Sequence, residues 1–212
     1  PSIVNSLISE NEAGFGGGGI YCRNFSSPTI LHCTISSNRA ELWNGVNWGG
    51  GILSVTSSSP TMTNAIVWGN TPTQWIRIDS SAPLITYSDI QGGFSGVGNI
   101  DSNPLFAGEK DYRLTAQSPC VDKGNPPSTN LPGNEHAALD YLENSRPQGA
   151  GWDMGAYEVV GTANPSNCPD CSGTSVVLEN VTFSAGPPCE CVCTESITIG
   201  GGIKVETGAS VT

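Results

Sequence analysis

The chain has 212 residues, of which 37% are hydrophobic, and it carries 27 glycines and 15 prolines, a composition that excludes an all-helical bundle. Eight Lys and Arg residues against 19 Asp and Glu give a net charge of −11, which disfavours binding to nucleic acid or to an anionic membrane. No window approaches the roughly 18 apolar residues of a membrane span, so no membrane insertion is expected. The first residue, Pro1, follows no Met or leader, which predicts a processed piece of a longer chain.

Four segments in the N-terminal part of the chain align without gaps. Each follows a proline, and Pro1, Pro28, Pro60 and Pro83 are 27, 32 and 23 residues apart. The shortest spacing is about one coil of a β-solenoid, in which each repeat stacks on the next. The four segments are residues 2–11, 29–38, 61–70 and 84–90.

Two apolar columns of this alignment lie five residues apart, and a single strand cannot place positions with an odd spacing on one face. A corner must therefore separate them. We place it at the column of Asn5 and Asn64, because asparagine tolerates the left-handed conformation and its amide can bond to the next coil. His32 and Tyr87 complete this corner column, and we interpret His32 as a structural substitute rather than a general base. The two apolar columns are Ile3, Ile30, Met62, Ile85 and Ile8, Ile35, Val67, Ile90.

A further strand in each coil follows a loop of variable length. We align its column at Ile20, Ile52 and Ile76, so that the preceding loops contain 8, 13 and 5 residues. This insertion corner is expected to be the most variable surface and the place of any sugar contact. Four tryptophans lie in or beside it, and they either stack on sugar rings or pack on one another to hold the loops down. These weak ligand-binding candidates are Trp43, Trp48, Trp68 and Trp75.

The repeats resemble the right-handed parallel β-helix repeats of bacterial surface proteins, including those of the polymorphic outer membrane protein-like kind. The strings that carry the resemblance are SPTI at 27–30, CTI at 33–35 and GGGI at 49–52. This resemblance implies an all-β fold, a right-handed parallel β-helix or solenoid.

The block from Asn99 to Glu158 does not repeat, and it resembles the C-terminal end of choice-of-anchor Q proteins. The matching strings are NIDSNPLF, DYRL, SPCVDKG and DMGAYE. In that family this block closes the β-helix, and an open solenoid end does need a cover for its unpaired strand groups. We interpret four charged residues of the block as an internal ion-pair network of the cap rather than an active site. They are Asp140, Arg146, Asp153 and Glu158.

The predicted organisation is therefore coils at 1–98, an irregular cap at 99–160, a linker at 161–175 and the truncated start of a second β module at 176–212. Five of the eight cysteines lie in the last two segments, and their spacing favours disulfides over a zinc ribbon, with at least four of the five within disulfide reach. Cys22 and Cys33 form either a core pair or two free buried thiols, and Cys120 is either unpaired or joined to another cysteine. The five C-terminal candidates are Cys168, Cys171, Cys189, Cys191 and Cys193.

The aligned strands offer no grouped carboxylates of the kind that glycoside hydrolysis or calcium-dependent lyase chemistry needs, because Glu10, Asp79 and Asp89 fall in different columns. No catalytic residue, metal or cofactor is expected. The sequence predicts a secreted, extracellular or cell-surface bacterial protein with a structural or adhesive role. Its expected partners are polysaccharide, other surface proteins or further copies of itself. Two alternatives stay open: a carbohydrate-active β-helix whose active coils lie upstream of Pro1, and a subunit of an extracellular filament or layer.

Overall fold

The computed structural model describes residues 1–41, 48–126 and 137–159, and the backbone of four further strands between residues 175 and 205. The chain divides into two units, Pro1–Val160 and Gly161–Thr212. The described residues form strands, turns and loops without a helix, so the predicted all-β class is confirmed. In these same ranges there is no helix that is long and apolar enough to cross a membrane.

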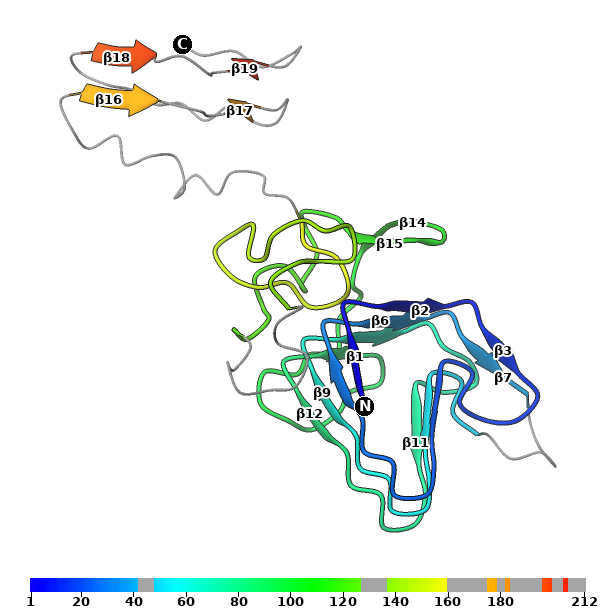
Figure 1. The fold of residues 1–212 in the computed structure, drawn as a ribbon. Helices are drawn as coiled ribbons and strands as arrows, with labels where there is room; N and C mark the ends of the chain where they lie inside the picture. The colour runs from blue at the N-terminus through cyan, green and yellow to red at the C-terminus, as the bar shows by residue number, and fades with distance from the viewer. Residues whose placement is uncertain are drawn as a thin grey trace. The chain divides into compact units, whose positions relative to one another are not determined.

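Three parallel sheets, which the chain visits in turn, make up most of the first unit (Figure 1). Sheet 1 contains β1 (Ser2–Val4), β5 (Thr29–Leu31), β9 (Thr61–Thr63) and β12 (Leu84–Thr86). Sheet 2 contains β2 (Leu7–Ser9), β6 (Thr34–Ser36), β10 (Ile66–Trp68) and β13 (Asp89–Ile90). Sheet 3 contains β4 (Ile20–Cys22), β8 (Ile52–Ser54) and β11 (Trp75–Arg77). A short parallel pair, β3 (Glu12–Ala13) with β7 (Arg39–Ala40), follows sheet 2 along the chain.

Equivalent strands of sheets 1 and 2 pair in the register that the prolines predict. Ser2 pairs with Thr29, Thr29 with Thr61, and Leu84 with Thr61, and the same spacing recurs in sheet 2. Both apolar columns lie in this register and contribute to one core, which stacks four layers of aliphatic side chains. Burial of each such side chain contributes roughly 1.5–3 kcal/mol. The buried members of this core are Ile30, Cys33, Ile35, Ile52, Met62, Ala65, Val67, Ile85 and Ile90.

The chain turns between sheets 1 and 2 at the predicted corner column. Asn5, His32, Asn64 and Tyr87 have φ angles of 46°, 50°, 53° and 48°, so all four residues adopt the left-handed conformation. This conformation reverses the alternation of side chains, which is why apolar positions five residues apart both reach the core.

Sheet 3 differs from the alignment by one residue in its last strand. Ile52 pairs with Trp75, and Leu53 pairs with Ile76, so the column of Ile20 and Ile52 continues into Trp75 and not into Ile76. Trp75 packs against the core. A large indole thus fills an inward position that the sequence alignment assigned to an isoleucine.

Sheet 2 has a second row of side chains that faces away from this core. The row consists of Leu7, Thr34, Ile66 and Asp89, which pair in register. Ile66 packs against Met154 in a separate buried cluster, and the backbone N–H of Ala156 donates to Thr34 Oγ1 at 3.0 Å. Both faces of sheet 2 are therefore buried, one by the core and one by a later part of the chain.

We call that later part, residues 103–126 and 137–159, the side cover. It includes the antiparallel pair β14 (Phe106–Gly108) and β15 (Asp111–Leu114), and in Figure 1 its green and yellow loops lie beside sheet 2. The last coil is followed instead by a shorter segment in which Ile100 bridges to Asp89 and Phe94 packs against the core. The block expected to close the end of the stack thus mainly covers its side, because the outer row of sheet 2 is itself apolar at Leu7 and Ile66.

The second unit contains two parallel strand pairs of its own. β16 (Ser175–Leu178) pairs with β18 (Ser196–Ile199), and β17 (Thr182–Phe183) pairs with β19 (Lys204–Val205). The second β module expected at 176–212 stays a prediction beyond these two parallel strand pairs.

Candidate functional site

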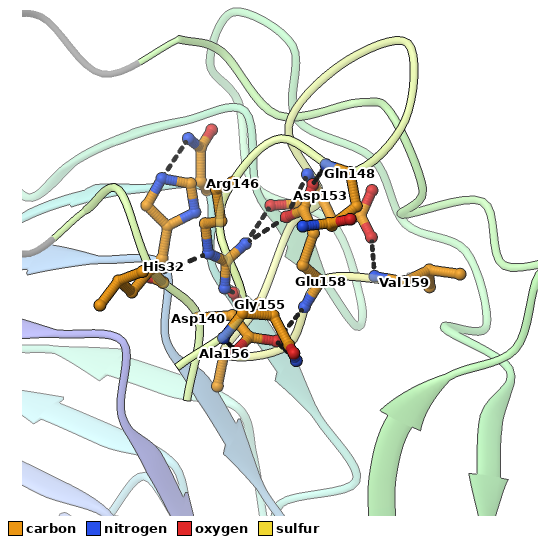
Figure 2. A network of polar contacts seen from close by, with 12 residues as sticks. His32, Asp140, Arg146, Gln148, Asp153, Gly155, Ala156, Glu158 and Val159 are labelled. Carbon is orange, nitrogen blue, oxygen red and sulfur yellow. Dashed lines mark hydrogen bonds and ion pairs between the residues drawn. The ribbon is translucent and has the colours of Figure 1, made fainter. Parts of the chain in front are cut away.

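The side cover is organised around a buried ion pair between Arg146 and Glu158 (Figure 2). Arg146 Nη1 donates to Glu158 Oε2 at 2.8 Å, and the two side chains are 0% and 1% exposed. The guanidinium also donates to the backbone carbonyl oxygens of Leu139, Asp153 and Gly155, at 3.3, 3.4 and 2.9 Å. One arginine therefore ties together several turns of the cover.

Asp140 and Asp153, which the sequence analysis assigned to the same ion-pair network, mainly bind backbone amides. Asp140 accepts from the N–H groups of Leu142, Asn144 and Glu158 at 2.8, 2.9 and 2.9 Å. Asp153 accepts from the N–H groups of Asp122 and Val159 at 2.8 and 2.7 Å. Irregular loops leave backbone donors without strand partners, and these carboxylates satisfy them.

Burial sets the electrostatics of this network. It raises the pKa of Glu158, and the neighbouring Asp153 carboxylate adds to this effect while Arg146 opposes it. Burial also raises the pKa of Asp153. The cover thus holds more carboxylates than cations in a space closed to water, an arrangement that needs every one of its hydrogen bonds.

His32 lies at the contact between the corner column and the side cover. Its side chain is 0% exposed, its ring centroid is 5.2 Å from that of Trp152, and its Nε2 is 3.2 Å from Asn64 Nδ2. Burial and the positive charge of Arg146 lower the pKa of His32 to about 3, so the ring is neutral and its Nε2 accepts the amide hydrogen of Asn64. The backbone N–H of Asn125 donates to Asn64 Oδ1 at 2.8 Å. This geometry makes His32 a structural contact between the corner column and the side cover.

A second asparagine column, which the sequence analysis aligned but did not single out, forms a ladder inside the stack. Asn38 and Asn70 are 0% and 3% exposed. Asn38 Nδ2 donates to Asn70 Oδ1 at 2.9 Å, and Asn11 Nδ2 donates to Asn38 Oδ1 at 2.9 Å. The ladder also satisfies carbonyl groups of sheet 2, since Asn70 Nδ2 donates to the oxygen of Ile35 at 2.9 Å. The signal was present as asparagine at one position of three aligned segments.

Asp89 connects the last coil with the side cover. Its carboxylate accepts from the Ser102 N–H at 3.1 Å and from Cys120 Sγ at 3.2 Å. Asp89 and Cys120 are both 0% exposed, and burial raises the pKa of Asp89 to about 6. Cys22, Cys33 and Cys120 are all buried free thiols, so of the two states left open for Cys22 and Cys33 the structure has the unpaired one.

The tryptophans in the described ranges do not form one ridge. Trp48 packs on Phe15, with ring centroids 4.9 Å apart, and Trp75 packs on Phe94 at 6.0 Å. Trp68 lies against the separate cluster outside sheet 2. Trp43 and the five C-terminal cysteines lie outside the described residues, so the ligand and disulfide predictions for them stay predictions.

Residues 1–41, 48–126 and 137–159 contain no group of three or more His, Cys, Asp or Glu side chains placed to hold a metal ion. No protein-family model, curated protein or solved structure matches the chain.

Proposed function

We propose that residues 1–159 form a right-handed parallel β-helix with a non-catalytic structural or adhesive role in an extracellular protein of a bacterial cell surface. The non-catalytic role is supported by the deeply buried ionisable side chains of the side cover, which bind other groups of the fold. Arg146 and Glu158 bind each other, and Asp140 and Asp153 bind backbone amides. Groups held in this way stabilise loops, which favours a structural role over a catalytic one.

The stacking pattern supports the helical part of the proposal. Three parallel sheets are visited in turn, and inward columns, left-handed corners and an asparagine ladder repeat from coil to coil. An architecture in which each coil contacts its neighbours gives a long, regular surface, which suits a scaffold or an adhesive stalk.

The alternative, a carbohydrate-active β-helix, places the active coils outside residues 1–212, and hydrolysis by the described residues themselves would require two accessible, cooperating carboxylates. Glu10 and Glu12 are accessible, but Glu10 pairs with Lys110 and Glu12 pairs with Arg39. Each of these two carboxylates is therefore paired with its own cation, and the two do not face one substrate position as a cooperating pair.

The test combines activity with location. The full chain is incubated with a panel of neutral and acidic polysaccharides, and new reducing ends and unsaturated uronates are measured. We expect no product above that of a heat-unfolded sample. Product formation that is lost in Glu10→Gln or Glu12→Gln would refute the non-catalytic role. Surface location is tested by protease treatment of intact source cells, where protection of the protein until lysis would contradict the proposal.

A further inference from the structure

An open groove lies where the β14–β15 hairpin of the side cover meets the carboxyl ends of the sheet 2 strands. We call it the hairpin groove, and its volume is about 570 Å³, within the range of roughly 300–1,000 Å³ typical of small-molecule sites. One wall is formed by residues at the carboxyl ends of β2, β6 and β10 and by the β3–β7 pair, and the other by residues of the hairpin.

Aromatic side chains line both walls of the hairpin groove. Trp68, the last residue of β10, lines the wall formed by sheet 2. Phe106 and Tyr112 line the hairpin wall, and their rings meet edge to face with centroids 5.3 Å apart. Trp68 is half-buried, so it is fixed by packing yet still contributes to the groove surface.

Four of the five charged side chains that line the groove form two opposite pairs. Lys110 Nζ is 2.5 Å from Glu10 Oε2, and Arg39 pairs with Glu12. Tyr112 adds a hydroxyl group, which donates to Glu10 Oε1 at 3.4 Å. Because the side chains of Lys110 and Arg39 are 65% and 58% exposed, their remaining N–H donors face solvent.

We propose that the hairpin groove binds a neutral, hydroxyl-rich oligosaccharide. Sugar rings present apolar C–H faces, which stack on aromatic rings, and hydroxyl edges, which need both donors and acceptors. In the groove, the Trp68 indole is available to stack on a C–H face of a sugar ring. The paired carboxylates and cations are available to accept from and donate to its hydroxyl groups.

The charge of the groove excludes other classes of ligand. Its three carboxylates, Glu10, Glu12 and Glu109, outnumber its two cations, Arg39 and Lys110. A phosphate or a uronic acid polymer would meet net repulsion, and an acyl chain would have to desolvate four paired charges. Saccharide binding at this site does not depend on the cellular location proposed above.

The test is isothermal titration calorimetry of the full chain with cellotetraose, tetra-N-acetylchitotetraose and maltotetraose, and with tetragalacturonate as the acidic counterpart. We expect at least one neutral tetrasaccharide to bind with a Kd of about 0.1–1 mM and tetragalacturonate to bind at least about tenfold more weakly. If none of the neutral sugars binds at about 10 mM, or if tetragalacturonate binds most tightly, the proposal is wrong.

Variants locate the binding. Trp68→Ala is expected to weaken it about tenfold. Since Trp68 also packs against a buried cluster, Lys110→Met, at an exposed side chain, provides the second test and is expected to weaken binding about threefold. Arg113→Met is the matched control, because Arg113 lies on the same hairpin, is 60% exposed and does not line the groove. Binding that survives both groove variants, or that falls equally in the control, overturns the assignment.

Discussion

The asparagine ladder predicts a large loss of stability from a single substitution, Asn38→Ala. The Asn38 side chain is 0% exposed and takes part in four hydrogen bonds. Its Nδ2 donates to the carbonyl of Ile8 and to Asn70 Oδ1, both at 2.9 Å, and its Oδ1 accepts from the backbone and side-chain nitrogens of Asn11, at 3.1 and 2.9 Å. Alanine removes all four hydrogen bonds, and its methyl group is too small to fill the buried space that the asparagine side chain occupies.

The size of the stability loss depends on which partners of Asn38 can form hydrogen bonds with water in the variant. Asn11 is exposed and recovers much of its hydrogen bonding from solvent, and Asn70 Oδ1 still accepts from the Asn38 backbone N–H at 2.9 Å, whereas the carbonyl of Ile8 loses the Asn38 amide inside the stack. A buried polar group that loses its partner costs roughly 1–3 kcal/mol, so we expect Asn38→Ala to lower the free energy of unfolding by about 2 kcal/mol. Asn11→Ala, at the exposed end of the ladder, is the matched control and should cost about 0.5–1 kcal/mol.

The assay is urea unfolding of the full chain, followed by circular dichroism. The comparison requires similar m-values, because a changed slope would mean that the two-state description differs between the variants. A loss below about 1 kcal/mol in Asn38→Ala, or equal losses at the two positions, would refute the reasoning that the buried ladder carries the stability.

Three further predictions concern the side cover and the buried thiols. Arg146→Met leaves Glu158 buried without its partner and should lower the free energy of unfolding by about 3–5 kcal/mol in the same urea assay, while the double variant Arg146→Met/Glu158→Gln should recover part of that loss. The pKa of Asp89 is raised from 3.8 to about 6, so its contribution to stability is fully present below pH 3.8 and is lost as the pH rises through 6; Asp89→Asn should remove a fall of about 3 kcal/mol from the pH profile of unfolding. The three buried thiols should resist iodoacetamide in the native chain and be alkylated after denaturation without reductant, as read by peptide mass mapping, whereas mapping that finds them in disulfides would contradict the structure. The same maps test whether at least four of the five C-terminal cysteines form disulfides.

The repeat in the sequence was enough to predict the stacked part of the fold. The prolines, the two apolar columns and the asparagine at the corner all recur at the same positions, and each reflects a local requirement: a start of a strand, an inward side chain or a left-handed turn. The aligned asparagines of the ladder carried the same kind of signal, since a buried amide bonds most readily to the same residue one coil away.

Only the tertiary structure decided features that depend on neighbours distant in sequence. Ile52 and Ile76 look equivalent in a sequence alignment, but Ile52 pairs with Trp75, whose indole packs against the core and beside Phe94. In the sequence, Asp140 and Asp153 look like ion-pair partners of Arg146. In the structure, their carboxylates accept hydrogen bonds from backbone N–H groups of the irregular loops. The position of the cover was set in the same way. Apolar residues of the side cover pack against the outer row of sheet 2. This packing is stabilised by burying the two apolar surfaces against each other. Neither segment alone contains a local sequence pattern that specifies its partner.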